Sequence, residues 1–229
     1  MYNLDYLYMS NKRFQNQQRE FLMKEGLQVF IKDKIDNNVS IKSVLDVVSS
    51  YLPSHLFTEI DSIYVGMFDD FEKKETNAAY KDGAIYISNE QDSEQDLIDD
   101  IVHEIAHSLE QPYGHIIYGD GSVKEEFLNK REKLYDILKA EGLNPDWDLF
   151  METEYSQKMD DYLYKEVGYD KLNFIAASYN LFTSAYPATS LREYFASGFE
   201  YYFLEDPTGL NKISPKLFNK IEEIHLDEQ

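Results

Sequence analysis

The chain contains no cysteine among its 229 residues. Disulfide bonds, cysteine nucleophiles and thiolate–metal sites are therefore excluded, and a transition metal must be held by histidine, aspartate or glutamate. Histidine is also scarce, with five in the whole chain. Two of these five histidines at the spacing of metal ligands therefore indicate a metal site more strongly than they would in a histidine-rich chain.

Positive charge is in short supply, since 22 lysines and arginines stand against 43 aspartates and glutamates, for a net charge of −21. Nucleic acids and anionic membrane surfaces attract basic patches, so we expect neither as a partner. No segment approaches the roughly 18 apolar residues of a membrane span. Residues 1–14 also lack the basic and apolar regions of a signal peptide. We expect a cytoplasmic protein of the producing cell, with signal-independent export or packaging into a particle left open and the oligomeric state unknown.

One compact metal-binding pattern is present, His103-Glu-Ile-Ala-His107. Apolar residues recur at three- and four-residue steps over residues 93–111, which predicts an amphipathic helix that Ser93, with Asp96 three residues later, caps and that stops at Pro112. On a helix, His103 and His107 lie one turn apart on one face and can bind the same ion. Glu104 is then placed to act as a general base on a metal-bound water. The alternative is two ordinary histidines on a plain helix.

A catalytic zinc site needs a third protein ligand. A third histidine in the pattern His-Glu-x-x-His-x-x-Gly-x-x-His is excluded, because Glu110 and Tyr113 stand where that pattern has glycine and histidine. Glu126, nineteen residues after the motif, has a spacing used by some zinc aminopeptidases but lies in a charged, solvated-looking helix. Glu193 lies among aromatic and small residues, which favours its burial against the metal helix. Ser190 and Glu193 also match a capping box, so the residues favour Glu193 but leave both glutamates open.

Periodicity predicts an α+β protein. Helices are expected over residues 11–36 and 40–51, a strand over 61–68, and a hairpin with an Asp82-Gly83 turn over 78–88. Further helices are expected over residues 122–141, 148–168, 170–182, 189–204 and 214–225. A small sheet should therefore precede the metal helix, and the C-terminal part should be mostly helical.

A second pattern lies downstream, in Tyr186-Pro-Ala-Thr-Ser-Leu-Arg-Glu193-Tyr-Phe-Ala-Ser-Gly-Phe199. Together with the histidine motif it resembles the catalytic domain of anthrax lethal factor and the related Pro-Pro endopeptidases. In that family a later helix supplies the glutamate ligand, and a tyrosine stands seven residues before it. Ser214-Pro-Lys-Leu-Phe218-x-x-Ile221 resembles the family's closing helix, so the resemblance covers roughly residues 60–225.

The resemblance implies a zincin-like metallopeptidase domain over residues 56–229, in which a small mixed sheet lies next to the active-site helix. Residues 1–55 are then expected to form a helical segment packed on that core. One zinc ion per chain would be bound by His103, His107 and Glu193. Glu104 would be the general base, and the Tyr186 phenol would donate a hydrogen bond to the developing oxyanion.

Two departures from the family pattern bear on function. Ser197 stands where the family usually has a second glutamate, and His107 and Glu193 are 86 residues apart, a longer gap than in the family. The added helices, broadly over residues 112–170, could reshape the cleft. The predicted function is a zinc endopeptidase whose peptide substrate is extended along strand 84–88. The alternatives are a catalytically silent zincin-fold structural or binding protein, and an aminopeptidase that uses Glu126.

Overall fold

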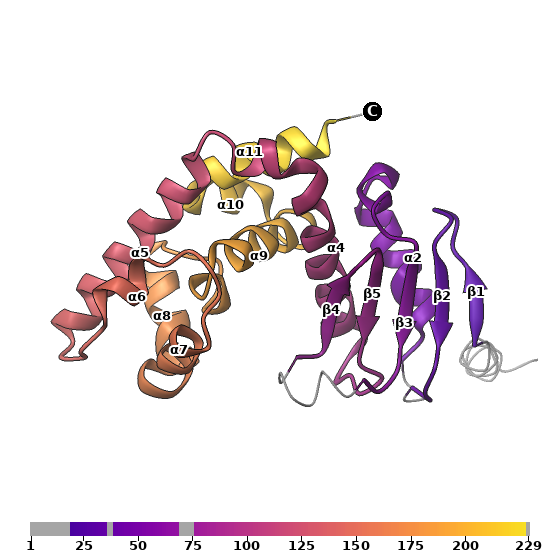
Figure 1. The fold of residues 1–229 in the computed structure, drawn as a ribbon, viewed down its shortest axis with the longest axis horizontal. Coiled ribbons are helices and arrows are strands. Elements are labelled where there is room, and N and C mark those ends of the chain that lie inside the picture. The colour runs from indigo at the N-terminus through magenta and orange to yellow at the C-terminus, as the bar shows by residue number, and fades with distance from the viewer. Residues whose placement is uncertain (1–18, 36–38, 69–75, 228–229) are drawn as a thin grey trace, which may run out of the picture. The chain divides into compact units, whose positions relative to one another are not determined.

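The computed structural model describes residues 19–35, 39–68 and 76–227 of the chain. Over these residues the protein is α+β and mostly helical, with one small mixed sheet (Figure 1). The described residues divide into two compact units, one up to Leu109 and the other from Glu110 onward. None of the described helices has both the length and the apolar character that crossing a membrane requires.

The first unit contains a five-stranded sheet. Its strands are β1 (Glu20–Leu22), β2 (Gln28–Ile31), β3 (Ser62–Val65), β4 (Ala78–Lys81) and β5 (Ala84–Ile87). Their order across the sheet is β1-β2-β3-β5-β4. The three central strands are parallel, whereas β1 and β4 pair antiparallel at the edges. Strand β5 therefore has a neighbour on each side, and β4 is the edge strand beside it.

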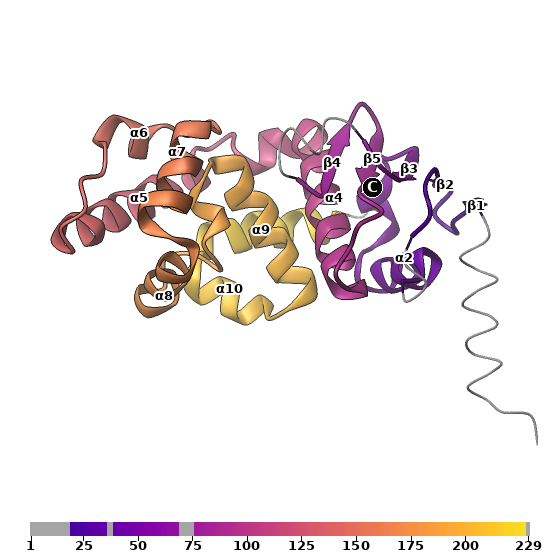
Figure 2. The same cartoon turned by 90° about the horizontal axis from the view of Figure 1, so that it is seen from below.

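Alternate side chains of the central strands point to opposite faces of this sheet. One face is apolar and buried, and helices α2 (Ile41–Tyr51) and α4 (Glu94–Ile117) cover it (Figure 2). Its buried residues are Val29, Ile31, Ile63, Val65, Ile85 and Ile87. On the other face Phe30, Tyr64 and Tyr86 stack in register, with ring centroids 5.0 and 5.4 Å apart. The core of the first unit therefore lies between the sheet and these two helices.

The predicted hairpin is confirmed. Strands β4 and β5 join through Asp82 and Gly83, whose φ angles of 50° and 80° place both residues in the left-handed region that a two-residue turn requires. The strand predicted over residues 61–68 is confirmed as β3, and the helix predicted over residues 40–51 is confirmed as α2. The side chain of Ser40 caps α2 by accepting a hydrogen bond from the Ser43 N–H.

Within the helical segment predicted over residues 1–55, the helix expected over residues 11–36 is wrong in the part that the structure describes. Residues 1–18 lie outside the described residues, and strands β1 and β2 occupy the rest of the helix predicted over residues 11–36. Val29 and Ile31 are buried and alternate with less buried neighbours, which is the period of a strand. Because β2 pairs with β3, residues on both sides of the predicted boundary belong to one sheet.

Helix α4 begins at its predicted cap but does not stop at Pro112, so that prediction is wrong. The Asp96 N–H donates to the Ser93 hydroxyl at 3.1 Å. The helix then runs through Pro112 and ends at Ile117. Proline inside a helix removes one backbone hydrogen bond and costs about 3 kcal/mol. Tyr113 and Ile117, which follow the proline, are buried, and their burial offsets this cost.

The second unit is helical. After the last turns of α4 its elements are α5 (Ser122–Ala140), α6 (Trp147–Met151), α7 (Gln157–Asp161), the π-helical turn η2 (Tyr162–Val167), α8 (Tyr169–Tyr179), the 3-10 turn η3 (Tyr186–Ala188), α9 (Leu191–Leu204), α10 (Pro207–Ile213) and α11 (Pro215–His225). Helices α5, α8, α9 and α11 confirm the helices predicted at these places. The single helix predicted over residues 148–168 is wrong, because the chain there divides into α6, α7 and η2. Helix α10 occupies a segment for which the sequence predicts a break.

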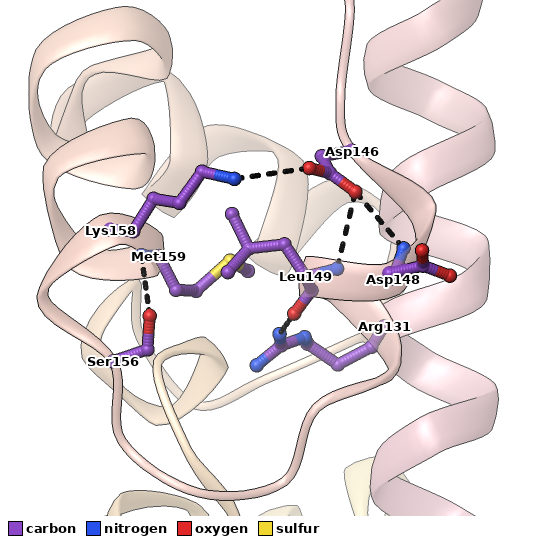
Figure 3. A network of polar contacts seen from close by, with 7 residues as sticks. All are labelled: Arg131, Asp146, Asp148, Leu149, Ser156, Lys158 and Met159. Atoms are coloured by element: carbon purple, nitrogen blue, oxygen red, sulfur yellow. Dashed lines mark hydrogen bonds and ion pairs between the residues drawn. The ribbon is translucent and has the colours of Figure 1, made fainter.

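The buried guanidinium of Arg131, on α5, explains why α6 ends so early. Its side chain is 0% exposed. Its Nε donates to the Phe150 carbonyl at 3.0 Å and its Nη2 to the Leu149 carbonyl at 2.8 Å (Figure 3). Its Nη1 donates to the Ala188 carbonyl at 2.7 Å. Carbonyls that a longer helix would use are bonded to Arg131, which also ties the end of α6 to η3.

Side-chain caps start the two short helices on either side of this break (Figure 3). Asp146 accepts the Asp148 N–H at 3.1 Å and pairs with the Lys158 ammonium at 3.2 Å. The Ser156 hydroxyl accepts the Met159 N–H at 3.3 Å. The ion pair joins the start of α6 to α7, so the two helices form one folded segment.

Lys130, the neighbour of Arg131, is also buried. Its ammonium donates to the Leu181 carbonyl at 2.5 Å and to the Ile213 carbonyl at 2.7 Å. Burial lowers the pKa of Lys130 to about 8 from 10.5. A neutral amine still has two N–H donors, so both hydrogen bonds persist when the proton is lost. Lys130 therefore holds two connections of the second unit together in either protonation state.

We predict that Arg131→Met lowers the free energy of unfolding by about 2–3 kcal/mol, because buried carbonyls lose their donors. Lys133→Met is the matched control, since Lys133 is exposed on the same helix, and it should change stability by less than about 0.5 kcal/mol. Denaturant unfolding measures both. Equal stability of the two variants would contradict the role given to Arg131.

We also predict that the contribution of Lys130 to stability rises with pH. Between its folded pKa of about 8 and its ordinary value of 10.5, the unfolded chain binds more protons than the native protein. The free energy of unfolding therefore increases with pH through this group. Denaturant unfolding from pH 7 to pH 10 should show the wild type gaining stability relative to Lys130→Met. A constant difference across that range would rule this out.

Candidate metal centre

Helix α4 places two histidines on one of its faces. His103 and His107 are four residues apart, and their ring centroids lie 5.0 Å from each other with the ring planes at 76°. The other faces of this part of α4 are apolar and buried, at Leu97, Ile101, Val102, Ile105, Ala106 and Leu109. The amphipathic pattern therefore fixes the helix on the sheet and leaves both imidazoles half-buried rather than in the core.

Glu193 joins these histidines. One ligand atom each from His103, His107 and Glu193 lie within 4.8 Å of one another, and all three side chains are half-buried. Two imidazole nitrogens and one carboxylate oxygen form a donor set that suits zinc and leaves a position open. The group can therefore hold a metal ion, and the residues predicted as ligands are brought together.

Helix α9 carries Glu193 in its first turn. The Ser190 hydroxyl accepts the Glu193 N–H at 3.2 Å, as the predicted cap requires. The cap uses the backbone of Glu193, so its carboxylate belongs to the metal group at the same time. The capping and ligand interpretations of Glu193 are thus compatible.

An ion pair that the sequence does not predict fixes the start of α9 against the end of α4. Arg192 Nε donates to both carboxylate oxygens of Glu110, at 3.0 and 2.9 Å. The Tyr118 hydroxyl donates to the same carboxylate at 3.2 Å. Glu110 lies three residues after His107, and Arg192 directly precedes Glu193. The pair therefore joins the two ligand-bearing helices within one turn of the ligands.

Ser197 lies one turn after Glu193, where the family pattern has a second glutamate. It is buried on α9 next to Gly198, against which α11 packs so closely that an added Cβ would overlap Leu217. A carboxylate near the ligands is supplied from α4, by Glu110, which accepts the Arg192 guanidinium. The only sequence signal for it is a carboxylate one turn after the second histidine.

Glu104 faces the sheet. It is 9% exposed, and its Oε2 accepts the backbone N–H of Tyr80 at 2.6 Å. Tyr80 belongs to β4, the edge strand of the described sheet. A hydrogen bond of this length to a carboxylate is strong and holds one oxygen in place. The edge strand therefore orients the glutamate of the histidine motif.

The substrate strand predicted over residues 84–88 must be corrected. Strand β5 pairs with β3 on one side and with β4 on the other, so its backbone groups are already used. A further strand can be added only where an edge is open. In the described sheet β4 is the edge strand near Glu104, and the Tyr80 N–H on its outer side is already bonded to Glu104.

Tyr186 lies on the turn η3, seven residues before Glu193, and its side chain is 39% exposed. The turn is held by Thr189, whose hydroxyl donates to the Tyr186 carbonyl at 2.8 Å. Burial, followed by the negative charges of Glu193 and Asp160, raises the pKa of the Tyr186 phenol. Its hydroxyl therefore keeps its proton at neutral pH and can act as a hydrogen-bond donor.

Glu126, the alternative ligand, has another role. Its carboxylate accepts the N–H groups of Lys216 at 2.9 Å and Leu217 at 3.2 Å, in the first turn of α11. It also accepts the hydroxyl of the buried Tyr194 at 2.8 Å. Free N–H groups at a helix start favour a carboxylate. Glu126 therefore caps α11, and the group of described residues that could hold a metal ion does not include it.

Comparison with known protein families, characterised proteins and solved structures finds no match to this chain.

We predict that Glu193→Gln reduces the bound zinc of the purified protein well below one ion per chain, because a neutral amide is a weaker ligand than a carboxylate. Glu126→Gln should retain zinc and lose about 1 kcal/mol of stability, as expected for a lost helix cap. Glu125→Gln, at an exposed neighbour on the same helix, is the control for both. Elemental analysis and denaturant unfolding give the two readouts. Loss of zinc in Glu126→Gln alone would reverse the ligand assignment.

Proposed function

We propose that the protein is a zinc-dependent endopeptidase with a zincin-like active site. The observation that carries the proposal is the group formed by His103, His107 and Glu193, with Glu104 inside the same helical motif. The donor set suits zinc, and a glutamate directly after the first histidine is the arrangement in which zinc peptidases place their base. The resemblance to the lethal factor and Pro-Pro endopeptidase family supports the same function.

A zinc ion held there would polarise the peptide carbonyl and lower the pKa of its water to roughly 7. Glu104 removes the proton from the attacking water and delivers it to the leaving amine. The N–H of Tyr80 holds one oxygen of Glu104 and so directs the other for this transfer. The Tyr186 hydroxyl donates a hydrogen bond to the oxyanion, an interaction that contributes about 3 kcal/mol in other enzymes.

The edge of β4 is the proposed place for the substrate backbone. Peptides commonly bind to sheet edges by strand addition, in which main-chain hydrogen bonds provide affinity. The Tyr80 N–H is already bonded to Glu104, so a peptide would pair with other backbone groups on the outer side of β4. A peptide extended along this edge would therefore run next to the base of the reaction. This placement replaces the one along residues 84–88.

We predict that Glu104→Gln binds zinc with unchanged stoichiometry and cleaves peptides about 10²–10⁴-fold more slowly, because the amide cannot accept the proton. Glu125→Gln is the control and should keep full activity. Cleavage of a random peptide library, with and without a chelator, measures the effect. Undiminished cleavage by Glu104→Gln would contradict the mechanism. A zinc-loaded wild type that cleaves no peptide would favour the catalytically silent alternative.

A further inference from the structure

The segment that lengthens the gap between His107 and Glu193 is joined to the start of the ligand helix. The Leu191 N–H donates to the Thr153 carbonyl at 2.9 Å, two residues before Glu193. Arg131 bonds the end of α6 and the end of η3 at the same time. The loop between α6 and α7 therefore lies alongside Tyr186 and Glu193, within the second unit.

Three side chains of this segment form a network next to that loop. Asp160 accepts the Tyr155 hydroxyl on Oδ2 at 3.1 Å and the Tyr169 hydroxyl on Oδ1 at 2.9 Å. Tyr155 is 48% exposed, and the other two side chains are half-buried. Asp160 lies near the end of α7, two residues before the π-helical turn η2, a feature that is frequent at functional sites. The network therefore combines a carboxylate with an exposed aromatic ring.

Electrostatic effects place this network close to the ligand helix. The pKa of Tyr186 is raised by burial, then by Glu193, and then by Asp160 and the two tyrosines of the network. The pKa of Tyr155 is raised to about 12 by burial and Asp160, with a further contribution from Glu193. These effects agree with the Thr153–Leu191 hydrogen bond, so the network borders the surface that includes Tyr186.

The partners of Asp160 differ from those of its acidic neighbours. Asp146 pairs with Lys158 at 3.2 Å, and Asp161 pairs with Lys165 at 2.9 Å. Within the described part of the chain, Asp160 receives the two phenol hydroxyls and no lysine or arginine. A phenol donates a hydrogen bond without neutralising the carboxylate. The Asp160 carboxylate therefore has lone pairs left to accept further donors.

We propose that Tyr155, Asp160 and Tyr169 form a subsite that binds a lysine or arginine side chain of the substrate. The carboxylate supplies the counter-charge, and the exposed tyrosine ring supplies a face on which a cation is attracted. The net charge of −21 draws basic peptides toward the protein from solution. The subsite rests on the proposed peptidase function and defines its substrate class, peptides with a basic residue at a fixed distance from the cleaved bond.

The test is cleavage of a random dodecapeptide library by the zinc-loaded wild type, by Asp160→Asn and by Asp170→Asn. Asp170 is exposed in the same segment and has no place in the network, so it is the matched control. We expect arginine and lysine to be enriched about tenfold at one position in the wild type and in Asp170→Asn. This preference should disappear in Asp160→Asn, and replacing arginine by neutral citrulline should abolish it in the wild type. Enrichment is a ratio, so a general loss of activity does not imitate the result.

Two further measurements separate this subsite from the peptidase function. In Tyr155→Phe the aromatic face remains and the hydroxyl is lost, so the preference for basic residues should persist. Binding of N-acetylarginine amide and N-acetylcitrulline amide, followed by NMR, does not need catalysis. The arginine probe should bind the wild type and not Asp160→Asn.

A wild type that cleaves peptides without a basic preference, or an equal preference in Asp160→Asn, would overturn the subsite and leave the proposed peptidase function standing. No cleavage at all, with selective binding of the arginine probe, would overturn the peptidase alone. Equal binding of both probes would overturn the subsite.

Discussion

The continuity of helix α4 is the constraint on which the candidate metal centre depends. The histidine pair lies in the middle of this helix, and Glu110, one turn later, accepts the guanidinium of Arg192. Pro112 removes a backbone hydrogen bond two residues after Glu110, yet the helix continues to Ile117, and Tyr113 and Ile117 are buried beyond the proline. A helix that stopped at the proline would end before these buried residues. The continued helix leads to Tyr118, whose hydroxyl donates to the same Glu110 carboxylate at 3.2 Å, so apolar burial after the motif supports the ion pair next to Glu193.

The sequence contains the local part of this site. The four-residue spacing of His103 and His107, the Ser93 and Ser190 caps and the Asp82-Gly83 turn depend on neighbouring residues, and all are found as predicted. Aromatic and small residues around Glu193 indicate the helix whose carboxylate reaches the histidine pair, because burial of a helix face is visible in its pattern. Helix α11 was predictable for the same reason.

What the sequence does not contain are pairings between distant residues. Arg192 and Glu110 are 82 positions apart, and nothing local distinguishes them from solvated charges. The division of the predicted helix over residues 148–168 depends on Arg131, which takes the carbonyls of Leu149 and Phe150 from 18 and 19 positions away. Strand β2 forms by pairing with β3, which is more than 30 residues away in the sequence. From the sequence alone Glu126 is a solvated or ligating glutamate, whereas in the structure its carboxylate accepts a backbone N–H at the start of α11.

The second unit shows how buried cations organise a long inserted segment. Lys130 and Arg131 donate to backbone carbonyls rather than to carboxylates, and so they join connections instead of forming ion pairs. These bonds bring the loop after α6 to the start of α9, beside Tyr186 and Glu193. On this account the segment reshapes the surface near the ligands, where Asp160 accepts the hydroxyls of two tyrosines.

The most direct test of the proposed metal centre is anomalous diffraction at the zinc absorption edge from crystals of the zinc-loaded protein. The account predicts one anomalous peak per chain, about 2.0–2.2 Å from an imidazole nitrogen of His103, an imidazole nitrogen of His107 and a carboxylate oxygen of Glu193. A peak coordinated by other residues, or no peak in a protein that contains stoichiometric zinc, would contradict it.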